Sequence, residues 1–290
     1  MSPFFILVGP PGVGKSTLFQ AFTGNYVAAF DYPGTAVPLV EGTVWMESRW
    51  VRVVDTPGVS SFLCPGEAER VTRDLLLAIP GAVAIVVADA LDLERALALV
   101  IELSELGVPL ALCLNKADGS AAGGLATDEA VLARRLGVPV VPTVATLGQA
   151  IRELRAALAH AEVPVLQADY GARVESAVTS VMRALANCRR ARGLSLMLLA
   201  GDGTARPWIE ARAGAGALIH VADLVEALTR EIGFLPAVIA DARRLAAARL
   251  AGSAQAPTAL RKRLERSAVA ASRFVTRAMA TLVGGSRRRT

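Results

Sequence analysis

Cysteine and histidine are scarce in this chain of 290 residues. The three cysteines, Cys64, Cys113 and Cys188, have no C-x-x-C spacing, and the only histidines are His160 and His220. This set cannot build a disulfide framework and offers no convincing zinc site. We therefore expect buried or idle thiols. The first residues also lack the basic region and cleavage site of a secretory signal, which favours a cytoplasmic protein.

Long apolar runs are also missing, although the mean hydropathy is high at +0.45. A membrane-spanning helix needs roughly 18–20 consecutive apolar residues. No charge-free run approaches that length, and the richest one, Leu75 to Ala88, is interrupted by Pro80 and Gly81. We expect a helix end, a turn and a buried strand there, and no span of the bilayer.

Acidic residues nearly disappear toward the C-terminus, where Glu265 is the only one between Arg261 and Thr290. The net charge of +5 and the pI of about 9.5 therefore describe a basic tail, and we expect no nucleic-acid binding across the molecule. Two interpretations of the tail stay open. It is a solvated helix with a ragged end, or a helix with an apolar face that suits the inner membrane leaflet or a membrane partner. That face comprises Phe274, Val275, Met279, Leu282 and Val283.

Short apolar runs alternate with helical patterns from Phe4 to Leu154, which indicates an α/β fold with a mainly parallel six-stranded sheet. Strands this apolar need helices on both faces of the sheet. The second and third strands are close enough to form an antiparallel hairpin. The predicted strands are Phe4–Val8, Val37–Val44, Val51–Val54, Val83–Val87, Leu110–Leu114 and Val138–Val141, and helices should begin near Lys15, Glu67, Asp92, Thr127 and Gly148.

The strand signals stop after Val163, which predicts a second, smaller, all-helical domain. We place the first domain at residues 1–162, the helical domain at 163–255 and a basic C-terminal helix and tail at 256–290. Helical spacing covers Tyr170 to Asn187, Leu194 to Leu199 and Val221 to Leu250. The segment Leu250–Pro257 is typical of a linker.

The first chemical motif follows the first strand and reads Gly9-Pro10-Pro11-Gly12-Val13-Gly14-Lys15-Ser16, a complete G-x-x-x-x-G-K-S. In this pattern the glycines let backbone N–H groups surround a β-phosphate, and the next helix adds its positive N-terminal end. Lys15 would reach the β- and γ-phosphates, and the Ser16 hydroxyl would bind Mg²⁺. A strand before the motif and a helix after it favour a phosphate-binding loop over a chance glycine-rich turn.

The second motif, Asp55-Thr56-Pro57-Gly58, ends the third strand. Asp55 is placed to hold Mg²⁺ through water, and the Gly58 N–H can bond a γ-phosphate. D-x-x-G is weak alone and becomes strong because it follows a phosphate loop at this distance.

The third motif, Asn115-Lys116-Ala117-Asp118, follows the fifth strand. Guanine presents two adjacent N–H donors that one carboxylate accepts together, whereas adenine does not. Asp118 therefore selects guanine, because another base would leave a buried carboxylate unpaired. Lys116 can cover the base and Asn115 can tie this loop to the phosphate loop.

A fourth, weaker segment follows the sixth strand, where GTPases present a backbone N–H to guanine O6. All four motifs lie at the C-terminal ends of strands. This is the edge at which α/β sheets bind ligands. They predict a P-loop GTPase domain that binds GTP or GDP with Mg²⁺. The candidate nucleotide residues are Gly9, Gly12, Val13, Gly14, Lys15, Ser16, Thr17, Asp55, Gly58, Asn115, Lys116, Asp118, Thr143, Val144 and Ala145.

Beyond these motifs, the chain resembles the cytosolic N-terminal region of FeoB-type ferrous-iron transporters. The segment from Tyr32-Pro33-Gly34-Thr35 through Glu41-Gly42 resembles the first switch of that family, and Asp55 to Gly58 with Glu69 to Arg73 resembles the second. The closest match runs from Asp89 to Arg95, through Leu106 to Pro109, into the N-K-x-D motif. Leu136 to Thr143 follows the last strand of the family, and Glu175 with Arg192 to Asp202 resembles its helical domain.

The resemblance implies a helical domain that couples nucleotide state to a membrane pore and can slow GDP release. It also implies a magnesium-ligating threonine, which a gapless match replaces by Ala36, so that the adjacent Thr35 becomes the candidate ligand beside Ser16 and Asp55. The family carries an asparagine that helps bind an activating potassium ion where this chain has Gly12. The pore domain is missing, so a separate chain supplies the permease or the sequence is truncated.

Fast GTP hydrolysis requires a group that orients the attacking water and a cation that offsets charge in the transition state. Val59 follows Gly58 and can do neither, so we expect slow turnover with Lys15, Thr35 and Gly58 as the candidate catalytic residues. Arg70 and Arg73 are candidates for a cation in cis, although charges on such a helix are more often solvated. Tyr32–Leu39 and Val59–Arg73 should change order with the nucleotide.

The sequence thus favours a regulatory GTPase that acts on a membrane-embedded ferrous-iron permease from the inner face of the cell membrane. An RNA-binding GTPase of ribosome assembly is less favoured, because aromatic residues make up only 5% of the chain and the second domain has no G-x-x-G loop with flanking basic residues. A third possibility, a module that senses GTP and hardly hydrolyses it, stays open.

Overall fold

The computed structural model describes residues 4–24, 27–31, 37–63, 65–122, 125–185, 190–214, 216 and 221–257. No helix within these ranges is both long enough and apolar enough to span a lipid bilayer. Residues 32–36 of the predicted first switch, among them Thr35, lie outside the described residues, as do Cys64, Cys188 and the basic tail beyond residue 257.

A seven-stranded sheet forms the centre of the N-terminal part, in the order β2-β3-β4-β1-β5-β6-β8. The strands from β4 to β8 in this order are parallel, whereas β3 is antiparallel to β4 and β2 to β3. The α/β prediction is confirmed, and β2 adds a strand that the sequence had not indicated. The strands are β1 (Phe4–Val8), β2 (Val27–Asp31), β3 (Pro38–Met46), β4 (Arg49–Asp55), β5 (Ala82–Asp89), β6 (Leu110–Asn115) and β8 (Val140–Pro142).

The predicted hairpin between β3 and β4 turns at Glu47 and Ser48, which both have positive φ, at 47° and 61°. Two consecutive positive φ angles are typical of the turn whose twist matches paired strands. Trp45 and Trp50 face each other across the hairpin with ring centroids 5.3 Å apart in an edge-to-face arrangement. This pair stabilises the hairpin although both rings are largely exposed.

Helices cover both faces of the sheet because successive strand residues point to opposite sides. Phe5 and Leu7 of β1 lie on the face of the sheet that is covered by α1 (Lys15–Thr23) and α6 (Ile151–Leu158). Ile6 and Val8 belong to the opposite core, with α2 (Glu67–Ala78), α3 (Leu93–Glu105) and α5 (Glu129–Leu136). Two short elements follow β6, namely α4 (Ala117–Ala122) and β7 (Leu125–Thr127).

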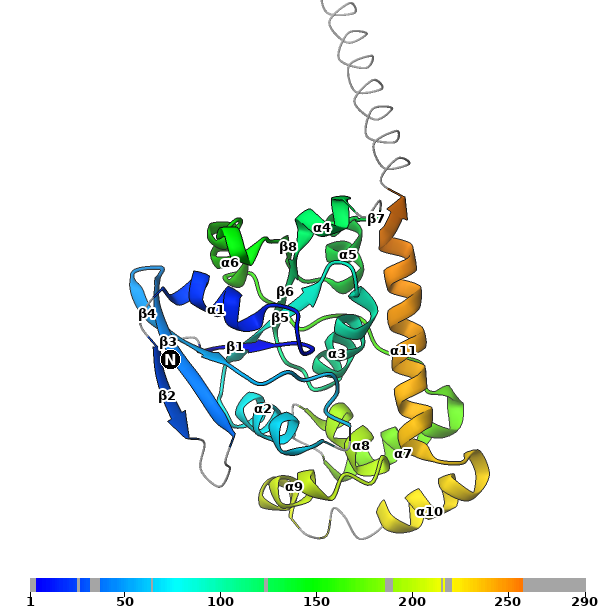
Figure 1. Ribbon diagram of the computed structural model, residues 1–290. Coiled ribbons are helices and arrows are strands. Elements are labelled where there is room, and N and C mark those ends of the chain that lie inside the picture. The colour runs from blue at the N-terminus through cyan, green and yellow to red at the C-terminus, as the bar shows by residue number, and fades with distance from the viewer. Residues whose placement is uncertain are drawn as a thin grey trace, which may run out of the picture.

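The C-terminal part is helical, as expected, and its buried residues belong to the same hydrophobic cluster as α3. In Figure 1 the long helix α11 runs beside α3 and ends next to β7. The helices are α7 (Gly171–Ala184), α8 (Ala191–Leu199), α9 (Arg206–Ala213), α10 (Val221–Ile232) and α11 (Leu235–Ala254).

The stretch with helical spacing from Val221 to Leu250 forms two helices, because Gly233 adopts a φ of 93° and proline follows at the start of α11. One expectation for this part is wrong. The predicted linker Leu250–Pro257 continues α11 to Ala254 and then forms β9 (Gln255–Pro257), which pairs with β7. The domain boundaries at 162 and 255 stay predictions.

Candidate nucleotide site

The phosphate-loop residues connect β1 to α1 at the carboxyl edge of the sheet. Gly12 and Gly14 have φ angles of 78° and 92°, and a Cβ on Gly14 would lie 2.4 Å from the Asn115 side-chain nitrogen. The loop therefore requires glycine at position 14 both for its conformation and for its close approach to the third motif.

Lys15 is the first residue of α1, and its side chain is buried beneath the loop. Its Nζ donates to the Gly9 carbonyl at 2.9 Å and to the Pro10 carbonyl at 3.1 Å. Burial lowers the pKa of Lys15, and the nearby carboxylate of Asp55 opposes this shift. A buried ammonium that is held only by neutral carbonyls is suited to an anionic ligand at the same loop.

Asp55 ends β4 and faces the beginning of α1. Burial raises the pKa of its carboxyl group, whereas a hydrogen bond from Ser16 and the charge of Lys15 lower it. Its Oδ1 is buried and has no hydrogen-bond partner among the described residues. An orphaned carboxylate oxygen beside a serine hydroxyl fits Mg²⁺, a hard cation that prefers oxygen ligands.

The segment after Asp55 lies against the phosphate loop. The Val59 N–H donates to the Gly9 carbonyl at 2.9 Å, and the Thr56 hydroxyl donates to the Leu7 carbonyl at 2.7 Å. Gly58 is also close to the loop, since a Cβ there would lie 2.7 Å from Pro11. The first two motifs therefore form one structural unit.

Asn115, at the end of β6, joins three loops. Its Nδ2 donates to the Val13 carbonyl at 2.9 Å, and its Oδ1 accepts the Ala145 N–H at 3.0 Å. The Thr143 hydroxyl lies 3.4 Å from the same Oδ1. The sequence predicts that the segment ending at Ala145 presents a backbone N–H to guanine O6, and in this structure the Ala145 N–H is bonded to Asn115.

Lys116 adopts a positive φ of 58° and extends over the phosphate loop. Its Nζ donates to the Gly12 carbonyl at 3.1 Å and pairs with Asp89 at 2.7 Å. Asp118 lies in the first turn of α4 with its side chain exposed. Asp89 was absent from the predicted site, although its position opposite Asn115 in the β5–β6 register places it at the same sheet edge.

A buried thiol lies directly behind this loop. Cys113 contacts the Thr143 hydroxyl at 3.0 Å, and burial raises the pKa of Cys113 to about 12. The thiol is therefore protonated at neutral pH, and the expectation of a buried thiol is confirmed at this position.

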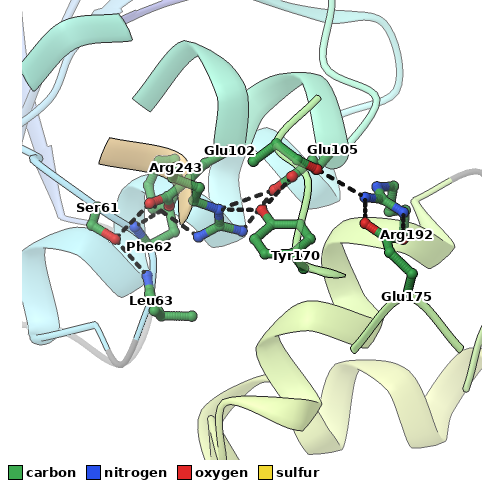
Figure 2. A network of polar contacts seen from close by, with 10 residues as sticks. Ser61, Phe62, Leu63, Glu102, Glu105, Tyr170, Glu175, Arg192 and Arg243 are labelled. Atoms are coloured by element: carbon green, nitrogen blue, oxygen red, sulfur yellow. Dashed lines mark hydrogen bonds and ion pairs between the residues drawn. The ribbon is translucent and has the colours of Figure 1, made fainter. Parts of the chain in front are cut away.

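A buried polar network connects the segment after Gly58 to the helical part (Figure 2). Glu102 of α3 accepts the Ser61 hydroxyl and the Phe62 N–H, both at 2.6 Å, and pairs with Arg243 of α11 at 3.1 Å. Arg243 also pairs with Glu105 at 2.8 Å, and Glu105 accepts the Tyr170 hydroxyl. Burial lowers the pKa of Arg243, but the charges of Glu102 and Glu105 outweigh it and raise the pKa overall.

Arg73 forms a second connection between α2 and the helical part. Its side chain is 1% exposed, and its guanidinium pairs with Asp202 at 2.7 Å and with Asp74 at 2.9 Å. The expectation of a solvated side chain is therefore wrong for Arg73. The sequence contained no signal for this contact, because the two partners are 129 positions apart.

A glycine-rich loop between β1 and α1, an acid at the end of β4 and an N-K-x-D turn after β6 meet at one edge of a mainly parallel sheet. This combination defines a P-loop G domain, here followed by a helical region. Residues 4–158 match the family described as Ferrous iron transport protein B. The chain belongs to this family.

Individual relatives agree with this assignment. The Fe(2+) transporter FeoB of Escherichia coli K12 is 32% identical over 254 residues, which cover 82% of this chain and 31% of the relative. The chain thus spans about a third of the length of the curated relatives that match it in this way. An S. thermophilus NFeoB variant bound to GDP is 25% identical with a TM-score of 0.76, covering 88% of this chain and 100% of that one. The cytosolic domain of T. maritima FeoB in its GMPPNP form is 26% identical with a TM-score of 0.74 and the same coverage.

Proposed function

We propose that this chain is a guanine-nucleotide switch that binds GTP and GDP with Mg²⁺, hydrolyses GTP slowly and controls ferrous-iron movement through a membrane permease. The observation that carries the proposal is Asn115, whose amide joins the phosphate loop at Val13 to the loop at Ala145. A nucleotide needs those loops in fixed register. Related chains bound to GDP or in the GMPPNP form, and a relative that is an Fe(2+) transporter, support it.

Asp118 selects the base in this proposal. Its exposed carboxylate accepts the two adjacent N–H groups of guanine, and the Lys116 stem covers the ring. The pairing of Lys116 with Asp89 and with the Gly12 carbonyl holds that stem over the phosphate loop. The backbone of Thr143 to Ala145 closes the far side of the base.

The phosphates lie against the loop from Gly9 to Gly14, with Thr17 on the first turn of α1. Lys15 exchanges its two carbonyl partners for phosphate oxygens, so that the buried ammonium gains an anionic partner. Ser16 and Asp55 hold Mg²⁺, with Thr35 as a further candidate ligand. When bound, Mg²⁺ offsets the charge of the phosphates.

The side chains near the γ-phosphate position support slow hydrolysis in this proposal. Val59 is fully buried and offers no polar atom that could orient water. Arg73 is held by Asp202 and Asp74 and is therefore not free to supply a cation. The binding residues Lys15 and Gly58, with Thr35, carry what catalysis there is.

The switch acts through the network of Figure 2. When the γ-phosphate is lost, the contact of Gly58 with it is lost as well, and the segment from Val59 to Leu63 is free to move. Ser61 and Phe62 in that segment are bound to Glu102, which pairs with Arg243. Movement of the segment therefore changes the partners of α11, the helix that leads to the C-terminal tail.

The partner in this proposal is a membrane-embedded ferrous-iron permease, supplied by a separate chain or by the part of the relatives that this chain does not span. The chain lies at the cytoplasmic face of the membrane, and its basic C-terminus contacts the inner leaflet or the permease. No nucleic-acid partner is proposed.

Hydrogen exchange tests the switch. Hydrogen exchange of the full chain is measured with saturating GDP·Mg²⁺ and, separately, with a saturating non-hydrolysable GTP analogue, and the two results are compared. We expect exchange to differ at Tyr32–Leu39 and at Val59–Arg73 and to stay equal at β5, which lies in the core. Binding of both nucleotides with identical exchange everywhere would refute a conformational switch while leaving nucleotide binding intact.

An affinity capture from native membranes tests the partner. The protein is immobilised in parallel with the GTP analogue and with GDP. Retention of a multi-span membrane protein in one nucleotide state supports the transport role. Recovery of ribosomal subunits, or of nothing that depends on the nucleotide, would contradict it.

A further inference from the structure

Strand β9, at the end of α11, pairs antiparallel with β7, which directly follows the helix that carries Asp118. The register places Ala126 opposite Ala256. The Asp128 N–H extends the pairing by donating to the Ala254 carbonyl at 2.7 Å. In Figure 1 the end of α11 meets β7 close to α4 and α5.

The sequence of β9 suits this register. Hydrogen-bonded pairs alternate along an antiparallel ladder, so the bond between Asp128 and Ala254 makes Ala126 and Ala256 the next hydrogen-bonded pair. Pro257, which has no N–H, then falls opposite Leu125 at a position that needs no donor. The proline therefore removes no hydrogen bond from the ladder.

Strand β9 also contacts the segment on the other side of the base loop, the name used here for the N-K-x-D turn Asn115–Asp118. Gln255 donates from its side-chain amide to the Ala90 carbonyl at 3.5 Å. Ala90 in turn donates its N–H to the Asn115 carbonyl at 3.0 Å, and the preceding residue, Asp89, pairs with Lys116. One short strand thus touches the segments on both sides of the N-K-x-D turn.

The base loop needs such support. Helix α4 has only six residues, and a helix of that length is marginal without tertiary contacts. Lys116 has a positive φ, a conformation that persists only where its surroundings hold it.

We propose that β9 braces the guanine-recognition loop, so that the strand leaving α11 sets how tightly and how long the base is held. The inference rests on the proposed function, because it concerns the same nucleotide site. It adds a contact between the C-terminal end of α11 and base recognition that is separate from the network at Ser61 and Arg243.

The test uses the full chain with two substitutions and a conservative control. Ala256→Pro removes the N–H that pairs with Ala126, and Gln255→Ala removes only the contact with Ala90. Ala256→Thr keeps the N–H and favours a strand, so it should behave as the unmodified chain. Release of a fluorescent GDP analogue is measured by displacement. The ratio of the affinities for GDP and inosine diphosphate is measured as well, because inosine lacks the amino group that donates a hydrogen bond to Asp118.

We expect Ala256→Pro to release the analogue about tenfold faster, as the loss of one or two backbone hydrogen bonds implies. Its preference for GDP over inosine diphosphate should fall by a similar factor, which a general loss of stability would not produce. Gln255→Ala should show the same changes to a smaller degree.

Equal release rates and equal base preference in all four proteins would overturn the brace. If Ala256→Pro melts at a lower temperature, Gln255→Ala decides, because its backbone pairing is intact. Failure of the unmodified chain to bind GDP would instead overturn the proposed function itself.

Discussion

Gly12 occupies the position in the phosphate loop where the resemblance implies an asparagine. Its φ of 78° is a conformation that asparagine adopts more readily than most other side chains. A Cβ at this position would meet no atom within 4 Å. The loop therefore has room for the asparagine that the resemblance associates with potassium.

We predict that Gly12→Asn folds with a stability cost of about 1 kcal/mol or less and that potassium stimulates its GTP hydrolysis. The unmodified chain should hydrolyse GTP below about 1 s⁻¹ and equally in sodium and potassium. Gly12→Ala is the matched control, since it adds a Cβ without an oxygen ligand. Strong potassium stimulation of the unmodified chain would show that the side chain at position 12 is not needed.

Glu175 and Arg192 form a two-pronged ion pair between α7 and α8, with both distances at 2.9 Å. Hydrogen bonds from Arg192 lower the pKa of Glu175. A lowered pKa contributes stability that is present above the pKa of the unfolded chain and is lost as the pH falls through that of the folded chain.

Glu175→Gln should therefore destabilise the protein by about 1 kcal/mol at pH 7, a figure kept small because the Glu175 side chain is 34% exposed. The difference should shrink when the pH falls below the ordinary glutamate range, because the unmodified residue is then protonated as well. Urea unfolding at neutral and acidic pH measures it. A difference that is unchanged at acidic pH would contradict the assigned cause.

At the scale of elements, α11 is attached to α3 through a buried charge. Arg243 pairs with Glu102 and Glu105, and all three side chains are at most 5% exposed. Removing one member of such a set leaves the others buried and unpaired, which is strongly destabilising. The adjacent Arg244 pairs with Asp241 at the surface and is 74% exposed.

Arg243→Met should lower the free energy of unfolding by about 3–5 kcal/mol, whereas Arg244→Met should change it by less than about 1 kcal/mol. Both variants remove one positive charge from the same helix. The difference between their free energies of unfolding, measured by chemical denaturation, therefore reports the loss of the buried ion pairs and not the loss of charge alone. Equal losses in the two variants would contradict the role of the network.

These elements also show why part of the structure could be predicted from the sequence and part could not. The apolar run at Phe4–Val8 and the motifs after three strands carry local signals, so their places at the sheet edge were predicted. Strand β9 has only three residues, and its partner β7 lies more than a hundred positions earlier, so no local pattern indicates the pair. Arg243 and Arg244 are adjacent arginines, and only packing against α3 buries one of them.

At the scale of the whole molecule, two chains of contacts lead from the nucleotide edge to α11 and to β9, the strand that follows it. One runs from Ser61 through Glu102 to Arg243, and the other from Asn115 through Ala90 to Gln255. The sequence predicted the nucleotide edge and a helical region as separate parts. The contacts between them depend on pairs distant in sequence, and they give a structural change at the nucleotide edge a direct route to the helical region.

Every step proposed for this chain requires that the sheet edge binds guanine nucleotides, and calorimetric titration of the full chain measures this binding. GDP and ADP are titrated in the presence of Mg²⁺, with Asp118→Asn as the matched variant. We expect GDP to bind at least about a hundredfold more tightly than ADP, because adenine cannot satisfy the carboxylate. Asp118→Asn should lose most of this affinity and gain affinity for xanthosine diphosphate. Equal binding of GDP and ADP, or no effect of Asp118→Asn, would show that this edge does not recognise guanine through Asp118.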